Sequence, residues 1–349
     1  MYSGNTPSRL NKEHFNGAIN WISSGELKEH YIADTKEKIS DEAAKTLKML
    51  PIGTFVIAIY GLEADGVRGT GSITKTEATI SQACMAFTSK GKVQNEFLYS
   101  WYKKHGNVIG IRYAQGTKQQ NLSYDIIEKF KIAYPTFQEQ EKLNKFIALL
   151  DERIATQSKI IDKLQSLIKG IRNEVFGKLR KNIGFNAVVG DVLDYEQPQS
   201  YIVENTEYTN EGTPVLTANK AFVLGYTLET DGIYDKGDCI IFDDFTLDCK
   251  YVDFPFKVKS SAIKILTAKN KELLRYTFEF LKYLDLSTEE HKRHYIAETQ
   301  NQEFILPTEQ IVKTIAYIFS TLSLRMETAV KRRDVFDKQK QYLLRQMFI

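Results

Sequence analysis

The sequence predicts an α+β protein made of two similar halves, each with a globular domain followed by one long helix. The first observation behind this prediction is a Pro-Thr helix start at Pro135 that returns 172 residues later at Pro307. The second is that apolar residues follow both starts with the same spacing. The third is that short apolar segments bounded by Gly and Asp fill the rest of the chain, as is typical of strands in α+β domains. We therefore expect a pseudo-twofold internal repeat.

We predict the two long helices over residues 135–184 and 307–349. Alternating steps of four and three residues from Leu143 reach apolar residues at nine of ten positions, and the same steps from Ile315 do so at eight of ten. A spacing of 3.5 residues sustained over this length is typical of supercoiled helices. The contact residues that we predict along this seam are Leu143, Ile147, Leu150, Ile154, Ile161, Leu164, Ile315, Phe319, Leu322, Met326, Phe336 and Leu343.

The two helices most economically bury each other, because both seams fall at the same offset and one seam cannot bury itself. Pro135 and Pro307 suit a first helical turn, where a missing N–H costs nothing. We expect the first helix to end near Phe176, and the second domain then leads back into the second helix. This order predicts an antiparallel coiled coil. A dimerisation coil or a single long core helix is the alternative.

The globular halves, residues 1–134 and 185–306, also resemble each other. "LPIGTFVIAIYG" from Leu50 corresponds to "DKGDCIIFDDFT" from Asp235, since each has a Gly followed by a β-branched apolar strand. "SQACMAFT" from Ser81 corresponds to "SSAIKILT" from Ser260, and "EFLYSWYK" to "ELLRYTFEFLK" as the start of an amphipathic helix. The segments predict the same strands and helix in both domains.

The net charge of +3 conceals an uneven distribution of charged residues. Residues 1–134 carry 17 Lys and Arg against 13 Asp and Glu, whereas residues 185–306 carry 12 against 21. Residues 135–184 and 307–349 each have four more basic than acidic residues. An acidic second domain argues against a general polyanion binder.

The sequence also predicts the cellular compartment of the protein. There is no apolar stretch long enough for a signal peptide or a membrane span, so we expect a cytoplasmic protein without membrane association. Three cysteines without metal-ligand spacing are expected to be buried thiols in a reducing environment: Cys84, Cys239 and Cys249.

No catalytic motif stands out. "GVRGTG" from Gly66 resembles a glycine fingerprint, but no helix clearly follows, so we interpret it as loop turns. "DDFTLDCK" holds Asp243 and Asp248, which we expect to be structural because their spacing is tight for a nuclease metal site. We expect no metal site and no cofactor in this chain.

Several polar loops suit contacts with nucleic acid. "RYAQGTKQQNLS" from Arg112 places Arg, Lys and Gln around a Gly turn, and such side chains can form paired hydrogen bonds with purine edges. "LTANKAFVLGYT" from Leu216 and "FPFKVKSSAIK" from Phe254 offer further candidates. In "EEHKRHYIAETQ" the His and Arg residues form either a solvated helix face or a phosphate contact.

These segments together resemble the DNA-specificity subunit of type I restriction–modification systems. The resemblance rests on "SGNTPSR" from Ser3, "INWISSGELK" from Ile19, "LPIGTFVIAIYG", "GTKQQNLS" and "ALLDERI" in the first half. "GTPVLT", "LGYT", "IIFDDFT", "FPFKVKSSAIKIL" and the end "LLRQMFI" carry it through the second half. The resemblance covers essentially the whole chain.

The resemblance implies two target-recognition domains, 1–134 and 185–306, and two helical spacer regions, 135–184 and 307–349. Each domain would read half of a bipartite site in double-stranded DNA, and the helices would set the spacer. The chain would have no catalytic activity of its own. It would dock two methyltransferase subunits that hold S-adenosylmethionine, and the complex would recruit restriction translocase–nuclease subunits that use ATP.

We predict DNA contacts from residues on the polar loops and basic segments of both domains. They are Arg9, Lys28, Arg68, Lys75, Arg112, Lys118, Gln119, Gln120, Asn219, Lys220, Tyr226, Lys250, Lys259, His291, Arg293 and His294.

One segment departs from the family pattern. "FNAVVGDVLDYEQPQSYIV" from Phe185 introduces the second domain, whereas the first domain begins almost at once with "SGNTPSR". We expect the N-terminal strand region of the first domain to be short. Two alternatives follow: a truncated or silent cassette that acts only as a coiled-coil interaction protein, or the specificity part of a fused methyltransferase–nuclease.

Overall fold

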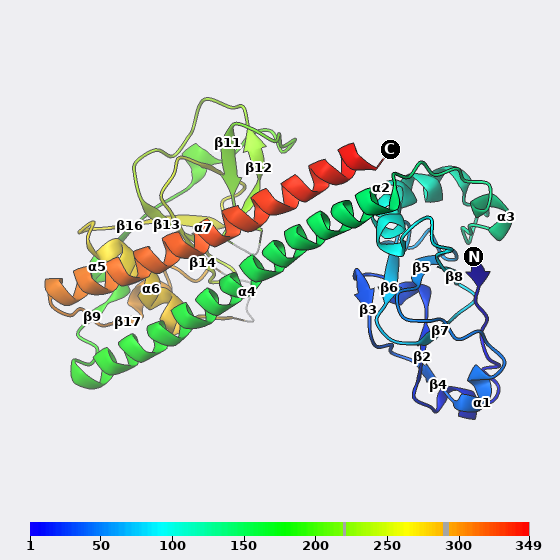
Figure 1. The fold of residues 1–349 in the computed structure, drawn as a ribbon. Helices are drawn as coiled ribbons and strands as arrows, with labels where there is room; N and C mark the ends of the chain where they lie inside the picture. Colours follow the sequence, from blue (N-terminus) through cyan, green and yellow to red (C-terminus); the bar gives the residue numbers. More distant parts are fainter. Residues whose placement is uncertain (219–220, 289–292, 349) are drawn as a thin grey trace. The chain divides into compact units, whose positions relative to one another are not determined.

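The computed structural model describes residues 1–218, 221–288 and 293–348, and these form two compact units. Unit 1 comprises Met1–Thr156 and Arg333–Ile349, and unit 2 comprises Gln157–Arg332. Figure 1 labels two long helices, α4 (Phe137–Asn182) and α7 (Glu309–Met347). Each of them contributes residues to both units. No helix within the described ranges is long and apolar enough to cross a membrane.

Unit 1 is built on a five-stranded sheet. Its strands lie in the order β1 (Tyr2–Ser3), β8 (Cys84–Phe87), β5 (Phe55–Ala58), β6 (Gly71–Thr74) and β3 (Tyr31–Ile32). A smaller sheet has the order β4 (Lys38–Ile39), β2 (Ile19–Ile22) and β7 (Ala78–Ile80). The helix α2 (Asn95–Tyr113) packs against β5 and β6.

Short helices complete unit 1. They are η1 (Lys12–Phe15), η2 (Ser24–Glu26), α1 (Asp41–Ala44) and α3 (Tyr124–Ile127).

Unit 2 repeats this arrangement around a four-stranded sheet. Its strands lie in the order β10 (Leu193–Glu196), β16 (Ile263–Ala268), β13 (Cys239–Asp243) and β14 (Cys249–Val252). A second sheet has the order β12 (Val223–Thr227), β11 (Thr213–Leu216) and β15 (Lys257–Val258), and a third pairs β17 (Glu303–Phe304) with β9 (Ala187–Val188). The helices are α5 (Val189–Val192), α6 (Leu273–Leu284), η3 (Gln199–Tyr201) and η4 (Thr299–Asn301).

The two sheets confirm the internal repeat. In unit 1, β5 pairs antiparallel with β8 and places Phe55 opposite Phe87. In unit 2, β13 pairs antiparallel with β16 and places Ile240 opposite Leu266. These strands are the ones that the sequence correspondence predicted, and all of their residues are buried except Phe87, Thr267 and Ala268, which are half-buried.

The long helices form the predicted antiparallel pair. In unit 1, Ile147 near the start of α4 shares a core with Phe348 at the end of the chain. In unit 2, Ile168 from the second half of α4 shares a core with Phe319 and Leu322 from the first half of α7. At 1.5 Å per residue, the 46 residues of α4 and the 39 of α7 span about 69 and 58 Å.

The seam residues predicted from the spacing are buried or half-buried at every position. Buried are Ile147, Leu150, Ile161, Ile315, Phe319 and Leu322; half-buried are Leu143, Ile154, Leu164, Met326, Phe336 and Leu343. Lys340, a polar residue at the same spacing, pairs with Asp151. Beside the seam, the Arg153 guanidinium lies 5.5 Å from the centroid of the Phe336 ring.

Three expectations about these segments need correction. The prolines precede the helices instead of occupying their first turn, because α4 begins at Phe137 and Thr136 caps it. The helix α4 does not end near Phe176 but continues to Asn182, where Gly184 with a φ of 76° follows. Arg293 and His294 lie in irregular structure before a turn at residues 295–298, and they do not form a helix face.

The three cysteines are free and buried, as predicted. Burial raises the pKa of each thiol to about 12, so these side chains are protonated and unreactive at neutral pH.

Candidate nucleic-acid interface

In unit 1 the structure joins Arg68 to Gln120, and three further residues predicted to contact DNA lie on the same or adjoining segments. We call them the Arg68–Gln120 cluster: Arg68, Arg112, Lys118, Gln119 and Gln120. Arg68 lies on the loop between β5 and β6, and Arg112 lies at the end of α2. Lys118, Gln119 and Gln120 lie on the loop after α2. The Arg68 guanidinium donates a hydrogen bond of 2.8 Å to the side-chain oxygen of Gln120.

Backbone hydrogen bonds hold the two loops of the cluster together. The carbonyl oxygen of Gln120 accepts a bond of 3.1 Å from the Leu62 N–H, and the Gln120 N–H donates 2.7 Å to a carboxylate oxygen of Glu63. The bond from this N–H holds the pKa of Glu63 below its usual range. These hydrogen bonds therefore hold the two loops to each other.

The loop after α2 is closed by a narrow turn. Gln115 and Asn121 exchange two backbone bonds of 2.9 Å each. Gly116 has a φ of 112°, and a Cβ there would lie 2.0 Å from the Gln119 carbonyl oxygen, so only glycine fits. The turn leaves the side chains of Lys118 and Gln119 exposed.

Close packing on α2 sets the position of Arg68. A Cβ at Gly110 would lie 2.5 Å from the Arg68 Cγ, so the arginine stem lies against the bare backbone of that helix turn. Two residues further on, Arg112 is exposed. A guanidinium, an ammonium and two carboxamides on ordered loops supply the donors and acceptors that recognise guanine and adenine edges.

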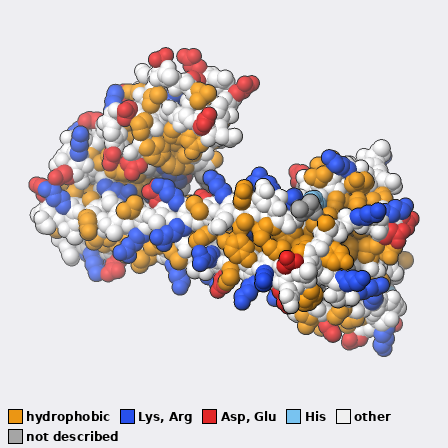
Figure 2. Space-filling model, turned by 45° about the horizontal axis from the view of Figure 1, so that its top comes forward, with side chains coloured by type: hydrophobic (Ala, Val, Ile, Leu, Met, Phe, Trp, Pro, Cys, Tyr) orange, Lys and Arg blue, Asp and Glu red, His pale blue; other side chains and the backbone are white. Residues whose placement is uncertain are grey.

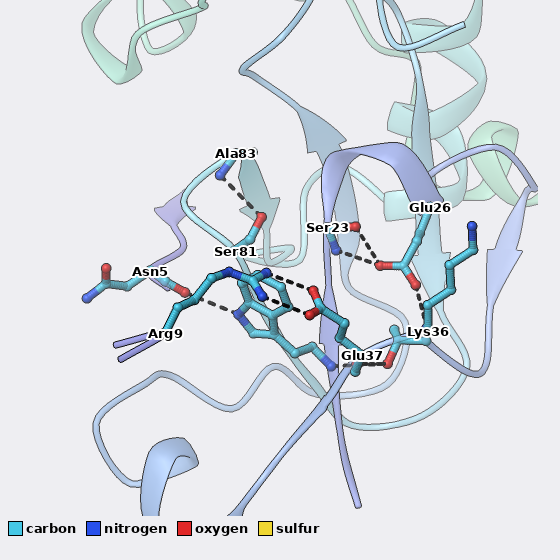
Figure 3. A network of polar contacts seen from close by, with 10 residues as sticks. Asn5, Arg9, Ser23, Glu26, Lys36, Glu37, Ser81 and Ala83 are labelled. Atoms are coloured by element: carbon cyan, nitrogen blue, oxygen red, sulfur yellow. Dashed lines mark hydrogen bonds and ion pairs between the residues drawn. The ribbon is translucent and has the colours of Figure 1, made fainter. Parts of the chain in front are cut away.

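Arg9 is engaged within unit 1. Its guanidinium donates two hydrogen bonds, of 2.9 and 2.8 Å, to the carboxylate of Glu37 (Figure 3). It also lies 4.6 Å from the Phe15 ring centroid and 5.5 Å from that of Trp21. The Trp21 indole N–H in turn donates to the Asn5 carbonyl at 3.2 Å. These contacts tie the N-terminal loop to the small sheet.

Lys28 and Lys75 lie on a different edge of unit 1, beside β3. The Lys75 ammonium lies 3.8 Å from the centroid of the Tyr31 ring, and Lys28 is exposed three residues before that tyrosine. The Tyr31 hydroxyl donates to Glu96 at 3.0 Å, and burial together with this carboxylate raises the pKa of Tyr31 to about 12. Glu96 also accepts from His30 at 2.8 Å.

In unit 2 the predicted contact residues are dispersed over several loops. Tyr226 is 37% exposed on β12. Lys259 and Arg293 are exposed, and Lys250 is half-buried with its ammonium 4.0 Å from Asp248. Asn219, Lys220 and His291 lie outside the described residues.

His294 is part of the core of unit 2 and does not belong to a DNA-facing surface. Its side chain is 1% exposed, and its ring Nδ1 lies 2.9 Å from a carboxylate oxygen of Glu298. Its backbone N–H donates to Asp244, a buried residue that also holds Tyr295. The sequence placed His294 among exposed charges, whereas the fold turns it inward to close the 293–298 turn.

The acidic segment "DDFTLDCK" has structural tasks, as predicted. Asp243 accepts the N–H groups of Phe245 and Thr246 at 3.0 Å each, which closes the turn after β13. Throughout the described ranges no group of three or more His, Cys, Asp or Glu side chains could hold a metal ion.

Sequence reasoning missed the acidic residues that organise these loops. Glu63 holds the Gln120 backbone, and Glu229 accepts the N–H groups of Glu204 and Asn205 together with the Lys257 ammonium. Their partners lie 57 and about 25 residues away along the chain. Nothing in the local sequence pattern signals such pairings.

Basic side chains do not form one continuous patch on the face shown in Figure 2, where blue and red side chains are interspersed with white and orange ones.

Comparison with known proteins gives consistent matches. Residues 2–166 match the family model described as type I restriction modification DNA specificity domain. The chain is 45% identical over 126 residues to the EcoR124I/EcoR124II specificity subunit of Escherichia coli, covering 34% of this chain and 31% of that protein. It is 25% identical over 207 residues to the MjaIX specificity subunit of Methanocaldococcus jannaschii, covering 58% of this chain and 47% of that protein. The chain therefore spans less than half the length of these curated relatives.

Solved structures share the fold over the whole chain. The type I restriction–modification S subunit from M. genitalium superimposes with a TM-score of 0.66 at 15% identity and covers 100% of this chain and 93% of its own. A chain from a type I restriction–modification system, solved to explain complex assembly and conformational transition, gives 0.51 at 13% identity and covers 94% and 90%. The resemblance inferred from the sequence is thus confirmed: residues 2–166 match the model of the type I restriction modification DNA specificity domain, and the curated relatives are specificity subunits.

Proposed function

We propose that this chain is a non-catalytic, sequence-specific DNA-recognition subunit of a type I restriction–modification complex. Each unit reads one half of a bipartite site in double-stranded DNA, and α4 with α7 fixes the spacer. The observation that carries this proposal is the duplication: two units with the same sheet arrangement share both long helices. One polypeptide with this repeat can address two half-sites related by an approximate twofold axis.

The Arg68–Gln120 cluster is the feature of unit 1 best suited to base recognition. Lys118 and Gln119 are exposed at the tip of an ordered turn, and Arg68 is held by Gln120. Ordered donors lose little conformational freedom on binding, which favours discrimination between bases. The remaining exposed basic residues, Lys28, Lys75, Lys259 and Arg293 among them, suit phosphate contacts.

The partners of the chain are methyltransferase subunits and, through them, restriction translocase–nuclease subunits. Methyltransferase subunits would dock on the exposed faces of the long helices, which carry solvent-exposed apolar side chains such as Phe146, Leu149, Tyr317 and Leu324. S-adenosylmethionine and ATP belong to these partner subunits. The specificity-subunit names of both curated relatives support this assignment.

A methylation map of cells that express this chain with its cognate methyltransferase tests the proposal. We expect modified bases at a bipartite motif with a constant spacer, and none when the methyltransferase is expressed alone. The double variant Lys118→Ala with Gln119→Ala should relax the preference in one half-site and leave the other half-site and the spacer unchanged. Lys36→Ala, an exposed charge in the same unit, is the matched control and should leave the motif intact.

Three outcomes would contradict the proposal. Assembly with the methyltransferase but no motif would indicate a silent cassette. Failure to assemble would leave a coiled-coil interaction protein. Binding of S-adenosylmethionine by the isolated chain would favour part of a fused methyltransferase–nuclease.

A further inference from the structure

Arg68 and Gln120 of unit 1 hold each other in one orientation. The Arg68 Nη2 donates a hydrogen bond of 2.8 Å to the Gln120 Oε1. A guanidinium has donors and no acceptor, so the carboxamide oxygen, and not its nitrogen, must face the arginine. The contact therefore engages the one acceptor atom of the Gln120 side chain and directs its amino group away from Arg68.

The contact leaves donor groups of both side chains free. Among the described residues, neither the Gln120 amino group nor the Arg68 Nη1 has a hydrogen-bond partner. Both side chains are half-buried, and the Arg68 Nε is buried without a partner. Arg68 alone therefore cannot form a paired contact through Nε and a terminal nitrogen. Together, the two residues present N–H donors to solvent while their acceptor atom is engaged.

Glycine packing fixes the loop that carries Arg68. Gly69 has a φ of 71°, and a Cβ there would lie 2.6 Å from the backbone nitrogen of Asn107, so the loop rests directly on the backbone of α2. The Arg68 stem lies against Gly110 on the same helix. The guanidinium is thus held by its own stem as well as by Gln120.

A carboxylate beside the pair disfavours a phosphate contact. One oxygen of Glu63 accepts the Gln120 N–H at 2.7 Å. Hydrogen bonds from the backbone N–H groups of Gln120 and Glu63 lower the pKa of this carboxyl, with a smaller contribution from the charge of Arg68. Glu63 is therefore ionised at neutral pH and repels a phosphate group. A neutral base edge suits this place better.

The donors of the pair match one base edge. In the major groove guanine presents two acceptors, N7 and O6, whereas adenine presents the N7 acceptor beside the N6 amino donor. A glutamine without a partner suits adenine, because its oxygen can accept from N6. In this structure the Gln120 oxygen faces Arg68 instead. The contact between the two side chains thus changes the base that Gln120 suits from adenine to guanine.

Unit 2 has no loop of the same length at the corresponding place. Residues 59–70 join β5 to β6, whereas residues 244–248 join β13 to β14. Leu247 in the shorter loop is 9% exposed, so this loop folds back onto its own unit. We therefore expect the donor pair to act on one half-site.

We propose that Arg68 and Gln120 together read a guanine in the half-site of unit 1, with one donor group from each side chain meeting O6 and N7. This inference rests on the proposed function, because it names the base that unit 1 reads. It assigns the specificity to the contact between two side chains and not to either side chain alone.

Two substitutions that replace the outward donor by an acceptor test the pair. Arg68→Met keeps an unbranched stem against Gly110 and releases the Gln120 oxygen. Gln120→Glu keeps the contact with Arg68 and turns a carboxylate oxygen toward the base. Each should lower the preference for guanine over adenine at one position of one half-site by about tenfold. Lys36→Ala, exposed in the same unit, is the control and should leave this preference unchanged.

The preference is measured on the chain in complex with its cognate methyltransferase. The methylation map locates the motif, and the anisotropy of labelled duplexes that carry guanine or adenine at each position gives the ratio of affinities. Thermal unfolding shows whether the variants are folded.

Base analogues test the same contact on the wild-type chain. At the guanine in question, 7-deazaguanine lacks the N7 acceptor and should lower the affinity about tenfold. Inosine lacks only the amino group in the minor groove and is the matched control, so it should bind as guanine does. The effect of 7-deazaguanine should shrink in Gln120→Glu, because one donor is missing.

A guanine preference that survives both substitutions would overturn the inference, and so would a motif in which neither half-site contains guanine. Equal weakening of all duplexes, with a smaller salt dependence of binding, would assign the pair to the DNA backbone and also overturn it. In each of these cases a bipartite motif remains, so the proposed function stands. Absence of any motif would overturn both.

Discussion

At one pair of matched positions, the buried side chains are charged in unit 2 and apolar in unit 1. In unit 2, Lys264 of β16 and Asp244 after β13 are each 1% exposed, and their charged atoms lie 3.5 Å apart. The strand registers place Met85 and Ile59 of unit 1 at the corresponding positions, 0% and 3% exposed. One sheet arrangement therefore accommodates either an ion pair or two apolar side chains.

The ion pair persists because both charges have further partners. The Lys264 ammonium donates to the side-chain oxygen of Gln197 at 2.7 Å. Asp244 accepts the N–H groups of His294 at 3.1 Å and Tyr295 at 2.8 Å, so it also holds the turn that brings these aromatic rings into the core. A buried pair is costly unless such bonds satisfy it. Both units therefore have the same sheet, but the side chains inside each unit differ according to the loop that packs on the sheet.

Exchanging the matched residues Met85 and Lys264 should give the largest change in the free energy of unfolding. Met85→Lys would bury an ammonium without a carboxylate in unit 1 and should lower the free energy of unfolding by at least about 4 kcal/mol. Lys264→Met should cost less, about 1–3 kcal/mol, because Asp244 keeps its two backbone donors. Urea denaturation followed by circular dichroism measures both.

Met85→Leu is the control for volume and should cost less than about 1.5 kcal/mol. Equal losses for the two charge exchanges would show that the partners of Asp244 do not matter, and the interpretation of unit 2 would then be wrong.

The helix pair offers a second comparison, because Leu150 and Leu322 occupy the same position of the repeat. They are 4% and 8% exposed, in unit 1 and unit 2 respectively. Replacing either with Asp should cost about 3–4 kcal/mol and disrupt the local helix contact, since an unpaired carboxylate would enter the seam. Leu324→Asp, at a residue 64% exposed, should change stability by less than about 0.5 kcal/mol. Unchanged thermal stability of the two seam variants would count heavily against the paired-helix arrangement.

The repeat, the helices and the strand pairs were predictable because their information is periodic and local. Leu143 and Ile315 begin seams whose spacing appears directly in the chain, and every predicted seam residue is buried or half-buried. The end of α4 was not predictable in the same way. The apolar seam ends near Phe176, but no residue before Gly184 stops the helix.

The candidate interface was predictable only in part. The Gly turn at Gly116 and its polar neighbours were visible in the sequence, but the pairing of Arg68 with Gln120 joins residues 52 apart. His294 shows the opposite case, since its charged neighbours suggested exposure and a single buried carboxylate, Asp244, determines its position. Side-chain contacts across the fold decide such residues, and no local pattern encodes them.

Substitutions at the two helix starts should give the smallest difference in stability between the halves. At α4, the Thr136 hydroxyl accepts from the Glu139 N–H at 3.4 Å, and the Thr136 N–H donates to the Glu139 carboxylate at 3.0 Å. At α7, Ile311 takes the place of Glu139, so Thr308 has no such reciprocal bond. Thr136→Ala should therefore cost about 1 kcal/mol, and Thr308→Ala only a few tenths.

Low pH should reduce the difference between the destabilisation caused by Thr136→Ala and that caused by Thr308→Ala. The hydroxyl and N–H of Thr136 lower the pKa of Glu139 from its ordinary value of 4.5. The contribution of this carboxylate is therefore present above pH 4.5 and is lost as the pH falls through the lowered value. Urea denaturation at pH 7 and near pH 3 should show Thr136→Ala approaching wild type in acid, while Thr308→Ala changes little. A Thr136→Ala deficit that is equal at both pH values would mean that the hydroxyl alone caps α4, and the two helix starts would then differ by less than their sequences indicate.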